Sequence, residues 1–183
     1  MAVAVMVMAS VCGAAVANAA EGKALVAYFS WSGNTASVAK AIAGALGADL
    51  FEIKTAKPYP TDYNATLDVA KAEQGRNARP ELAAHVQAMG QYDTVFLGYP
   101  NWWGTIPMAL CTFLEKHDLS GKRVIPFVTH GGSSFGRSLS DIRKLAPKAN
   151  LEEKGLSLSG SSASGAGSRV SSWLEGLGFT VKK

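Results

Sequence analysis

Apolar and polar residues follow one another in a regular order from residue 23 onward. Five short apolar runs alternate with longer stretches in which apolar residues recur at helical spacing. Runs that are apolar throughout are typical of strands covered on both faces by helices. They predict strands at residues 24–29, 50–53, 94–99, 123–128 and 151–159, the last centred on 155–158.

The stretches between these runs predict the helices. The last one contains Val170, Trp173, Leu174 and Leu177, whose spacing places them on one face of a helix. Other helices are expected around 38–46, after Pro60, from Pro80 (burying Leu82, Val86 and Met89), from Pro107 and around 139–145. This alternation predicts an α/β fold with a parallel sheet between two helical layers. Pro126 counts against a regular central strand, because it removes a main-chain donor from the fourth run.

The first twenty residues differ from the rest of the chain. They carry no charged side chain and end in Ala17-Asn18-Ala19, the small-x-small pattern that leader peptidases accept. We therefore expect residues 1–20 to be an export signal cleaved after Ala19 or Ala20, and 21–183 to form one domain. An uncleaved membrane anchor is the alternative, because a spanning helix needs about 20 apolar residues. A working leader implies an exported, periplasmic or extracytoplasmic protein; otherwise the protein is cytoplasmic.

Composition narrows the class of protein. With 183 residues, 48% of them hydrophobic and 17% charged, the chain has the material for one folded core. Its 18 Lys and Arg against 14 Asp and Glu are spread along the chain, which argues against nucleic-acid binding. The two cysteines have no metal-ligand spacing and cannot make a disulfide scaffold, so no metal is expected.

The loop after the first strand is predicted to bind phosphate. In a parallel α/β sheet, ligands bind beyond the carboxyl ends of the strands, and this loop leads directly into a helix. Unpaired N–H groups at a helix N-terminus suit a phosphate, whereas a helix cap alone would explain a single hydroxyl. The loop consists of Ser30, Trp31, Ser32, Gly33, Asn34 and Thr35.

The loops after the third and fourth strands also have unusual compositions. In the third-strand loop, two adjacent indoles predict that one packs in the core while the other stacks on a planar ligand. Glycines and hydroxyls in the fourth-strand loop predict N–H donors for a polar heteroaromatic edge, a flexible surface turn being the alternative. The residues concerned are Pro100, Asn101, Trp102, Trp103 and Gly104, then Thr129, His130, Gly131, Gly132, Phe135 and Gly136.

With these three loops in order, the chain resembles flavodoxins and flavodoxin-like FMN proteins over residues 23–181. Residues 30–35 resemble their FMN phosphate loop, 98–103 their flavin-stacking loop, and 129–133 the loop that holds the pyrimidine side of the ring. The resemblance implies FMN as the cofactor, bound by the residues named above. It also implies a flavodoxin-like three-layer sandwich with a five-stranded parallel sheet in the order 2-1-3-4-5.

Three functions follow from this resemblance. The first is an electron-transfer protein that works with a redox partner protein or a small acceptor such as a quinone. The second is an NAD(P)H-dependent FMN quinone reductase, and the third a flavin-free binding module on the same fold. Because residues 30–35, 98–107 and 129–137 contain no Asp or Glu, the anionic hydroquinone is expected to be less disfavoured than in an acidic carrier. His130 is a candidate catalytic residue, with a histidine bonded to the loop main chain as the alternative.

Overall fold

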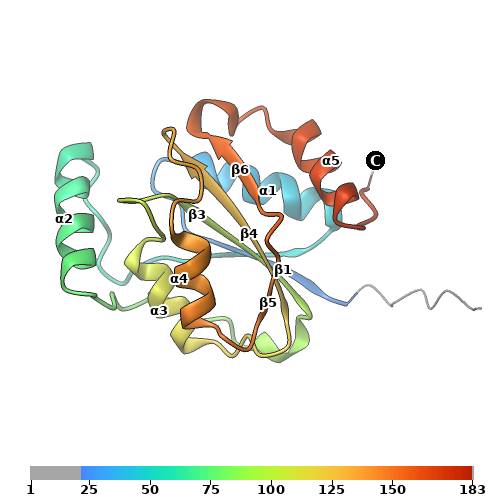
Figure 1. Cartoon of the computed structure of the whole chain (residues 1–183), viewed down its shortest axis with the longest axis horizontal. Coiled ribbons are helices and arrows are strands. Elements are labelled where there is room, and N and C mark those ends of the chain that lie inside the picture. Colours follow the sequence, from blue (N-terminus) through green and yellow to red (C-terminus); the bar gives the residue numbers. More distant parts are fainter. Residues whose placement is uncertain (1–21, 183) are drawn as a thin grey trace, which may run out of the picture.

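The computed structural model describes residues 22–182 and shows one parallel sheet between two layers of helices (Figure 1). The strands follow the order β2-β1-β3-β4-β5, and β6 also pairs with β4. The predicted order 2-1-3-4-5 is therefore confirmed, with the fifth position shared by two short strands. Their bounds are β1 Ala24–Tyr28, β2 Asp49–Glu52, β3 Thr94–Pro100, β4 Arg123–His130, β5 Asn150–Leu151 and β6 Leu156–Ser159.

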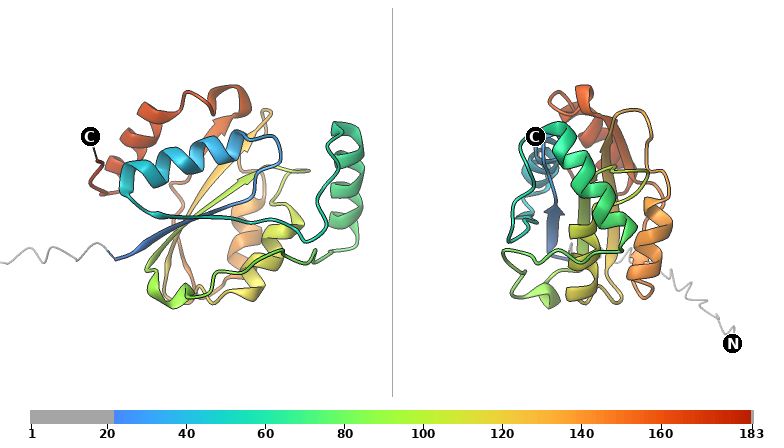
Figure 2. Two further views of the ribbon diagram at one scale, coloured as in Figure 1. Left: turned by 180° about the vertical axis from the view of Figure 1, so that it is seen from behind. Right: turned by 90° about the vertical axis from the view of Figure 1, so that its left-hand side faces the viewer.

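Four helices cover the sheet, and a fifth stands away from it. The helices α1 (Asn34–Leu46) and α5 (Gly167–Gly176) lie on one face, while α3 (Met108–Lys116) and α4 (Ser138–Leu145) lie on the other (Figures 1 and 2). Helix α2, Tyr63–Gly75, projects beyond the edge of the sheet in both figures. Short 3₁₀ turns occupy Met89–Gln91 and Gly160–Ser162. No helix among residues 22–182 is long and apolar enough to cross a membrane.

Alternate residues of the central strands enter two separate cores. Leu97 of β3 packs toward α3 and α4, while its neighbour Phe96 packs with α1 and α5. This alternation follows from the two-residue repeat of a strand, and it explains why the runs are apolar throughout. The three-layer α/β sandwich predicted from the sequence is therefore confirmed, whereas the predicted leader at residues 1–20 lies outside the described residues.

Pro126 lies inside the central strand β4 in spite of its missing N–H. Strand β4 pairs with β5 up to Val124 and with β6 from Phe127 onward, so Pro126 faces the break between them. The N–H of Glu152 donates to the Val124 carbonyl, so the main chain of Val124 faces β5. Main-chain groups alternate in direction along a strand, and the nitrogen of Pro126, two residues later, therefore faces the same side as the Val124 carbonyl. The split of the fifth strand thus removes the need for the donor that proline lacks.

The helix predicted from Pro80 is wrong. Residues 80–88 run as an irregular strap, and only Met89–Gln91 form a helical turn. Leu82 pairs with Thr55 in an antiparallel bridge, supported by hydrogen bonds from Ala56 N–H to the Glu81 carbonyl and from Ala83 N–H to the Lys54 carbonyl. Leu82 and Met89 are buried as expected, but Leu82 reaches the core from extended chain because residues 54–56, after β2, pair with it.

Candidate functional site

The carboxyl ends of β1, β3 and β4 bring the three predicted loops to one edge of the sheet. In the loop after β1, Gly33 has φ +87° and precedes the first turn of α1. The Ser30 hydroxyl accepts a 3.2 Å hydrogen bond from the N–H of Ala36. Within the described part of the chain, the N–H groups of residues 31–35 donate to no protein group. These free donors, together with the positive end of the α1 dipole, are suited to an anion.

The loop after β3 contains a tight two-residue turn that separates the two indoles. Main-chain hydrogen bonds join Trp102 and Thr105 in both directions, and Trp103 and Gly104 between them have φ of +51° and +83°. Two residues of positive φ define the type I′ geometry, which turns consecutive side chains apart. The structure therefore packs the partly buried Trp102 against the core and leaves Trp103 44% exposed.

Each indole is held by a different part of the chain. The ring of Trp102 packs edge-on against Phe29 at 5.3 Å and Tyr59 at 5.1 Å. Trp103 instead contacts α2. Its Nε1–H donates to the Leu67 carbonyl at 3.1 Å, and the Lys71 ammonium lies 5.1 Å from the centre of its ring. The predicted packing of one indole is confirmed, while stacking of a ligand on the other stays a prediction.

The loops after β3 and β4 form one unit. The Asn101 side chain donates to the Ser134 carbonyl at 2.6 Å, and the N–H of Arg137 donates to the Gly104 carbonyl at 2.9 Å. A Cβ at Gly136 would collide with the Gly104 carbonyl, so only glycine allows this approach. The buried Oδ1 of Asn101 has no hydrogen-bond partner among the described residues, which leaves an acceptor for a ligand N–H.

His130 is bonded through both ring nitrogens. Its Nδ1 accepts the N–H of Gly132 at 2.9 Å, and its Nε2 lies 3.0 Å from the Ser157 hydroxyl. These bonds orient the imidazole and hold the start of the loop, as in the main-chain-bonded alternative. The remaining loop residues divide by burial: Gly131 and Gly132 are exposed, whereas Phe135 packs partly against the core. A catalytic role of His130 stays a prediction.

The sequence pointed to Tyr59 and Tyr63 after β2 as a possible cover of the flavin, but it did not show the contacts that this segment makes. The Nε1–H of Trp31 donates to the Pro60 carbonyl at 2.8 Å, and the Tyr59 hydroxyl donates to Glu73 at 2.6 Å. Glu73 is only 8% exposed, and burial together with this carboxylate raises the pKa of Tyr59. Residues 54–79 have no strong hydrophobic periodicity. The aromatic side chains of Trp31 and Tyr59 were therefore the sequence signal that could have indicated a contact between this segment and the loop after β1.

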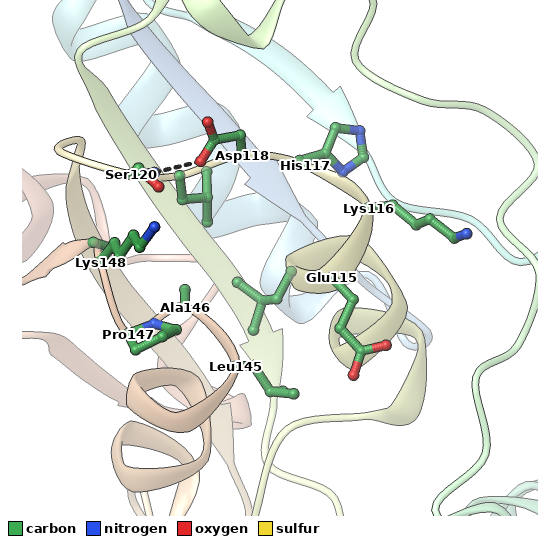
Figure 3. Close-up of a pocket in the computed structure, with 12 residues that line it drawn as sticks. Glu115, Lys116, His117, Asp118, Ser120, Leu145, Ala146, Pro147 and Lys148 are labelled. Atoms are coloured by element: carbon green, nitrogen blue, oxygen red, sulfur yellow. Dashed lines mark hydrogen bonds between the residues drawn. The ribbon is translucent and has the colours of Figure 1, made fainter.

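Cavities open at both ends of the sheet. One of about 530 Å³ borders the loop after β1, where Phe29, Trp31 and Tyr59 line it. Another of about 570 Å³ lies at the amino ends of the strands, between the ends of α3 and α4 (Figure 3). Figure 3 shows His117 and the Asp118–Ser120 turn at its rim. Helix α3 runs between this rim and the loop after β3, so the cavity lies at the opposite end of the sheet from the three loops. Residues 22–182 contain no cluster of three side chains suited to a metal ion.

One edge of the sheet thus brings together free N–H donors, an unpaired buried acceptor and an exposed indole. They fit a ligand that joins a phosphate to a planar, hydrogen-bonding ring system, as a flavin mononucleotide does. A family model described as flavodoxin matches residues 23–177. The chain belongs to the flavodoxin family.

Solved structures agree with this assignment. A candidate flavoprotein from Bacteroides eggerthii DSM 20697 is 37% identical, with a TM-score of 0.73 over 86% of this chain and 98% of that one. A second, from Bacteroides uniformis ATCC 8492, is 34% identical, with a TM-score of 0.74 over 84% and 98%. A flavoprotein from Lactobacillus acidophilus NCFM, solved in complex with FMN, is 26% identical, with a TM-score of 0.66 over 83% and 98%. The comparison with curated proteins gave no match.

Proposed function

We propose that this protein binds FMN at the edge formed by β1, β3 and β4 and transfers electrons through it. The observation that carries the proposal is the row of free N–H groups at residues 31–35, at the position where the family fold begins its first helix. The FMN complex of the Lactobacillus acidophilus flavoprotein, which is similar over most of both chains, supports the same cofactor.

FMN is the cofactor, and the chain's own residues suit its parts. The N–H groups of residues 31–35 and the hydroxyls around them would hold the phosphate. Trp103 presents an exposed face to the ring system, and the free Oδ1 of Asn101 would accept a ring N–H. When bound, FMN supplies one-electron or two-electron redox chemistry, while the protein supplies position and electrostatics.

A second candidate function is an NAD(P)H-dependent quinone reductase. The observation that favours it is charge: residues 30–35, 98–107 and 129–137 hold no carboxylate, whereas Lys71 lies over Trp103 and Arg137 adjoins its turn. Positive charge beside this turn would favour an anionic reduced flavin over an uncharged one, by Coulomb attraction. A stabilised hydroquinone favours passage of two electrons together.

An anaerobic reductive titration of the FMN-loaded protein tests both candidates. Accumulation of a semiquinone in the visible spectrum supports single-electron transfer. Direct passage from oxidised to fully reduced flavin supports the two-electron reductase, to be followed by turnover with NADPH and a quinone. A protein that stays colourless after incubation with FMN would contradict the cofactor assignment and favour the flavin-free module.

The partners and location belong to the same proposal. We expect a redox partner protein or a small acceptor such as a quinone, and no nucleic acid, because the net charge of +4 is spread along the chain. Export rests on residues 1–20. Expression in a Gram-negative host, followed by N-terminal sequencing of the periplasmic protein, should find a chain that begins at Ala20 or Glu21. An intact N-terminus on membrane-bound protein would support the anchor.

A further inference from the structure

A further pocket borders the turn that carries Trp103. Its volume is about 410 Å³, and it lies between the end of α2, the helix α3 and the helix α4. Three cations, Arg79, Arg137 and Lys144, line it together with a single carboxylate, Asp141. The pocket is therefore electropositive and adjoins a loop of the flavin site.

The carboxylate of Asp141 accepts a hydrogen bond from one edge of the Arg137 guanidinium. Buried Thr105, 1% exposed, donates its hydroxyl to Asp141 Oδ2 at 2.6 Å, and Arg137 Nε donates to the same oxygen at 3.1 Å. Burial alone would raise the pKa of Asp141, but these hydrogen bonds and the Arg137 charge bring it below its usual value. Asp141 thus remains ionised and orients the guanidinium, as an outer partner orients a ligand-binding group.

The other edge of Arg137 is free. Neither Nη1 nor Nη2 of Arg137 donates to any group within residues 22–182. Lys144 lies 3.5 Å from Asp141 and its side chain is 74% exposed. Arg79, by contrast, uses its three nitrogens on Glu115, Asn77 and Ala78. Two cations therefore share one carboxylate, and the unused fork of Arg137 has the geometry that pairs with phosphate oxygens.

Arg137 is also attached to the flavin-stacking turn. Its N–H donates to the Gly104 carbonyl at 2.9 Å, and Thr105, which holds Asp141, is the next residue after that turn. An anion held by the fork would lie beside the turn that carries Trp103. The pocket is too small for a whole dinucleotide but large enough for a phosphate group.

We propose that Arg137, assisted by Lys144, binds a phosphate group of a phosphorylated nicotinamide dinucleotide, the NADPH class of electron donor. This inference rests on the second candidate function. It makes Arg137 the residue that distinguishes phosphorylated from unphosphorylated dinucleotides, while Thr105 and Asp141 are positioning residues.

Calorimetric titration of the FMN-loaded protein with NADP⁺, NAD⁺ and inorganic phosphate tests this assignment. NADP⁺ should bind about 10- to 100-fold more tightly than NAD⁺, because a charge-assisted pair is gained. The preference should fall with rising salt. Arg137→Gln should abolish this preference. Arg169→Gln, an exposed arginine on α5 at the opposite face of the sheet, is the matched control and should leave it intact.

Three results would overturn the inference. Equal binding of NADP⁺ and NAD⁺, or a preference that survives Arg137→Gln, would remove the phosphate contact. Inorganic phosphate that binds as tightly as NADP⁺ would show an anion site without a dinucleotide. Loss of FMN binding in Arg137→Gln would assign the residue to FMN itself. If the protein never binds FMN, the proposed function fails, and the same titration of the flavin-free protein still decides whether Arg137 selects NADP⁺.

Discussion

The hydroxyls of Thr35 and Thr129 lie 2.8 Å apart in the buried centre of the site, although 94 residues separate them along the chain. Thr35 belongs to the first turn of α1, and Thr129 stands near the end of β4. This contact fixes the loop with the free N–H groups against the loop that follows β4. This side-chain pair thus joins the loops after β1 and β4 directly, in addition to the main-chain pairing of β1, β3 and β4.

Thr35→Val should destabilise the protein by about 1–2 kcal/mol, because it leaves the Thr129 hydroxyl buried without a partner. Urea unfolding of the flavin-free protein measures the loss. The double variant Thr35→Val/Thr129→Val should recover part of it, since neither site then buries an unpaired hydroxyl. Additive losses in the double variant would show that the two hydroxyls are not coupled.

Gly136→Ala should cost about 2 kcal/mol or more, because Gly136 has φ +53° and an added methyl group would collide with the Gly104 carbonyl. FMN affinity should fall with it, since this approach joins the loops after β3 and β4. Gly131→Ala is the control, because a methyl group there meets open space. Thermal unfolding and FMN titration of both variants should separate them; similar behaviour of the two would contradict the role of Gly136.

Removal of Trp102 should affect mainly the stability of the protein, and removal of Trp103 mainly its affinity for FMN. Trp102→Ala should lower the free energy of unfolding by about 3 kcal/mol, since its ring packs against Phe29 and Tyr59. Trp103→Ala should change stability little, because its ring is 44% exposed, yet weaken FMN binding about tenfold through lost stacking. Unfolding curves and FMN titrations measure the two effects. Normal FMN affinity in Trp103→Ala would assign stacking to another side chain.

Stability should decrease as the pH falls below about 6.5, because of His117. Burial lowers the pKa of this histidine, whose Nε2 accepts the N–H of Val86 while Nδ1 lies 2.9 Å from the Phe113 carbonyl. The unfolded chain therefore binds more protons than the folded one in this range, and the stability of the neutral form is lost on acidification.

Urea unfolding at pH 7.5 and 5.5 measures this dependence. His117→Gln should flatten the pH profile between these values. The exposed His85, whose ring lies 5.4 Å from that of His117, is the smallest of the causes that lower the pKa of His117, so His85→Gln should change the profile far less. Carboxylates with lowered pKa values, such as the exposed Glu115 beside Arg79, act only at more acidic pH. An unchanged profile in His117→Gln would contradict the assignment.

Local patterns along the chain were sufficient for the strands and most helices. Runs such as 94–99 are apolar throughout because both faces of a parallel sheet are covered, and the polar loops after them are the places where ligands bind in such sheets. The position of the three loops at one edge of the sheet was therefore predictable from composition and order, whereas their contacts with a phosphate and a ring stay predictions. The helix at Pro80 was wrongly predicted, because an apolar segment with helical spacing can also reach the core as an extended strap.

By itself, then, the sequence determined the order of elements, the α/β class, the flavodoxin resemblance and the three loops of the site, since each depends on neighbouring residues. Only the tertiary structure decided which indole is exposed, that Asn101 has a free buried acceptor, and that Thr105, Asp141 and Arg137 form a chain of hydrogen bonds. These properties depend on contacts between residues tens of positions apart. Such contacts are settled by the packing of the whole chain, and no local spacing encodes them.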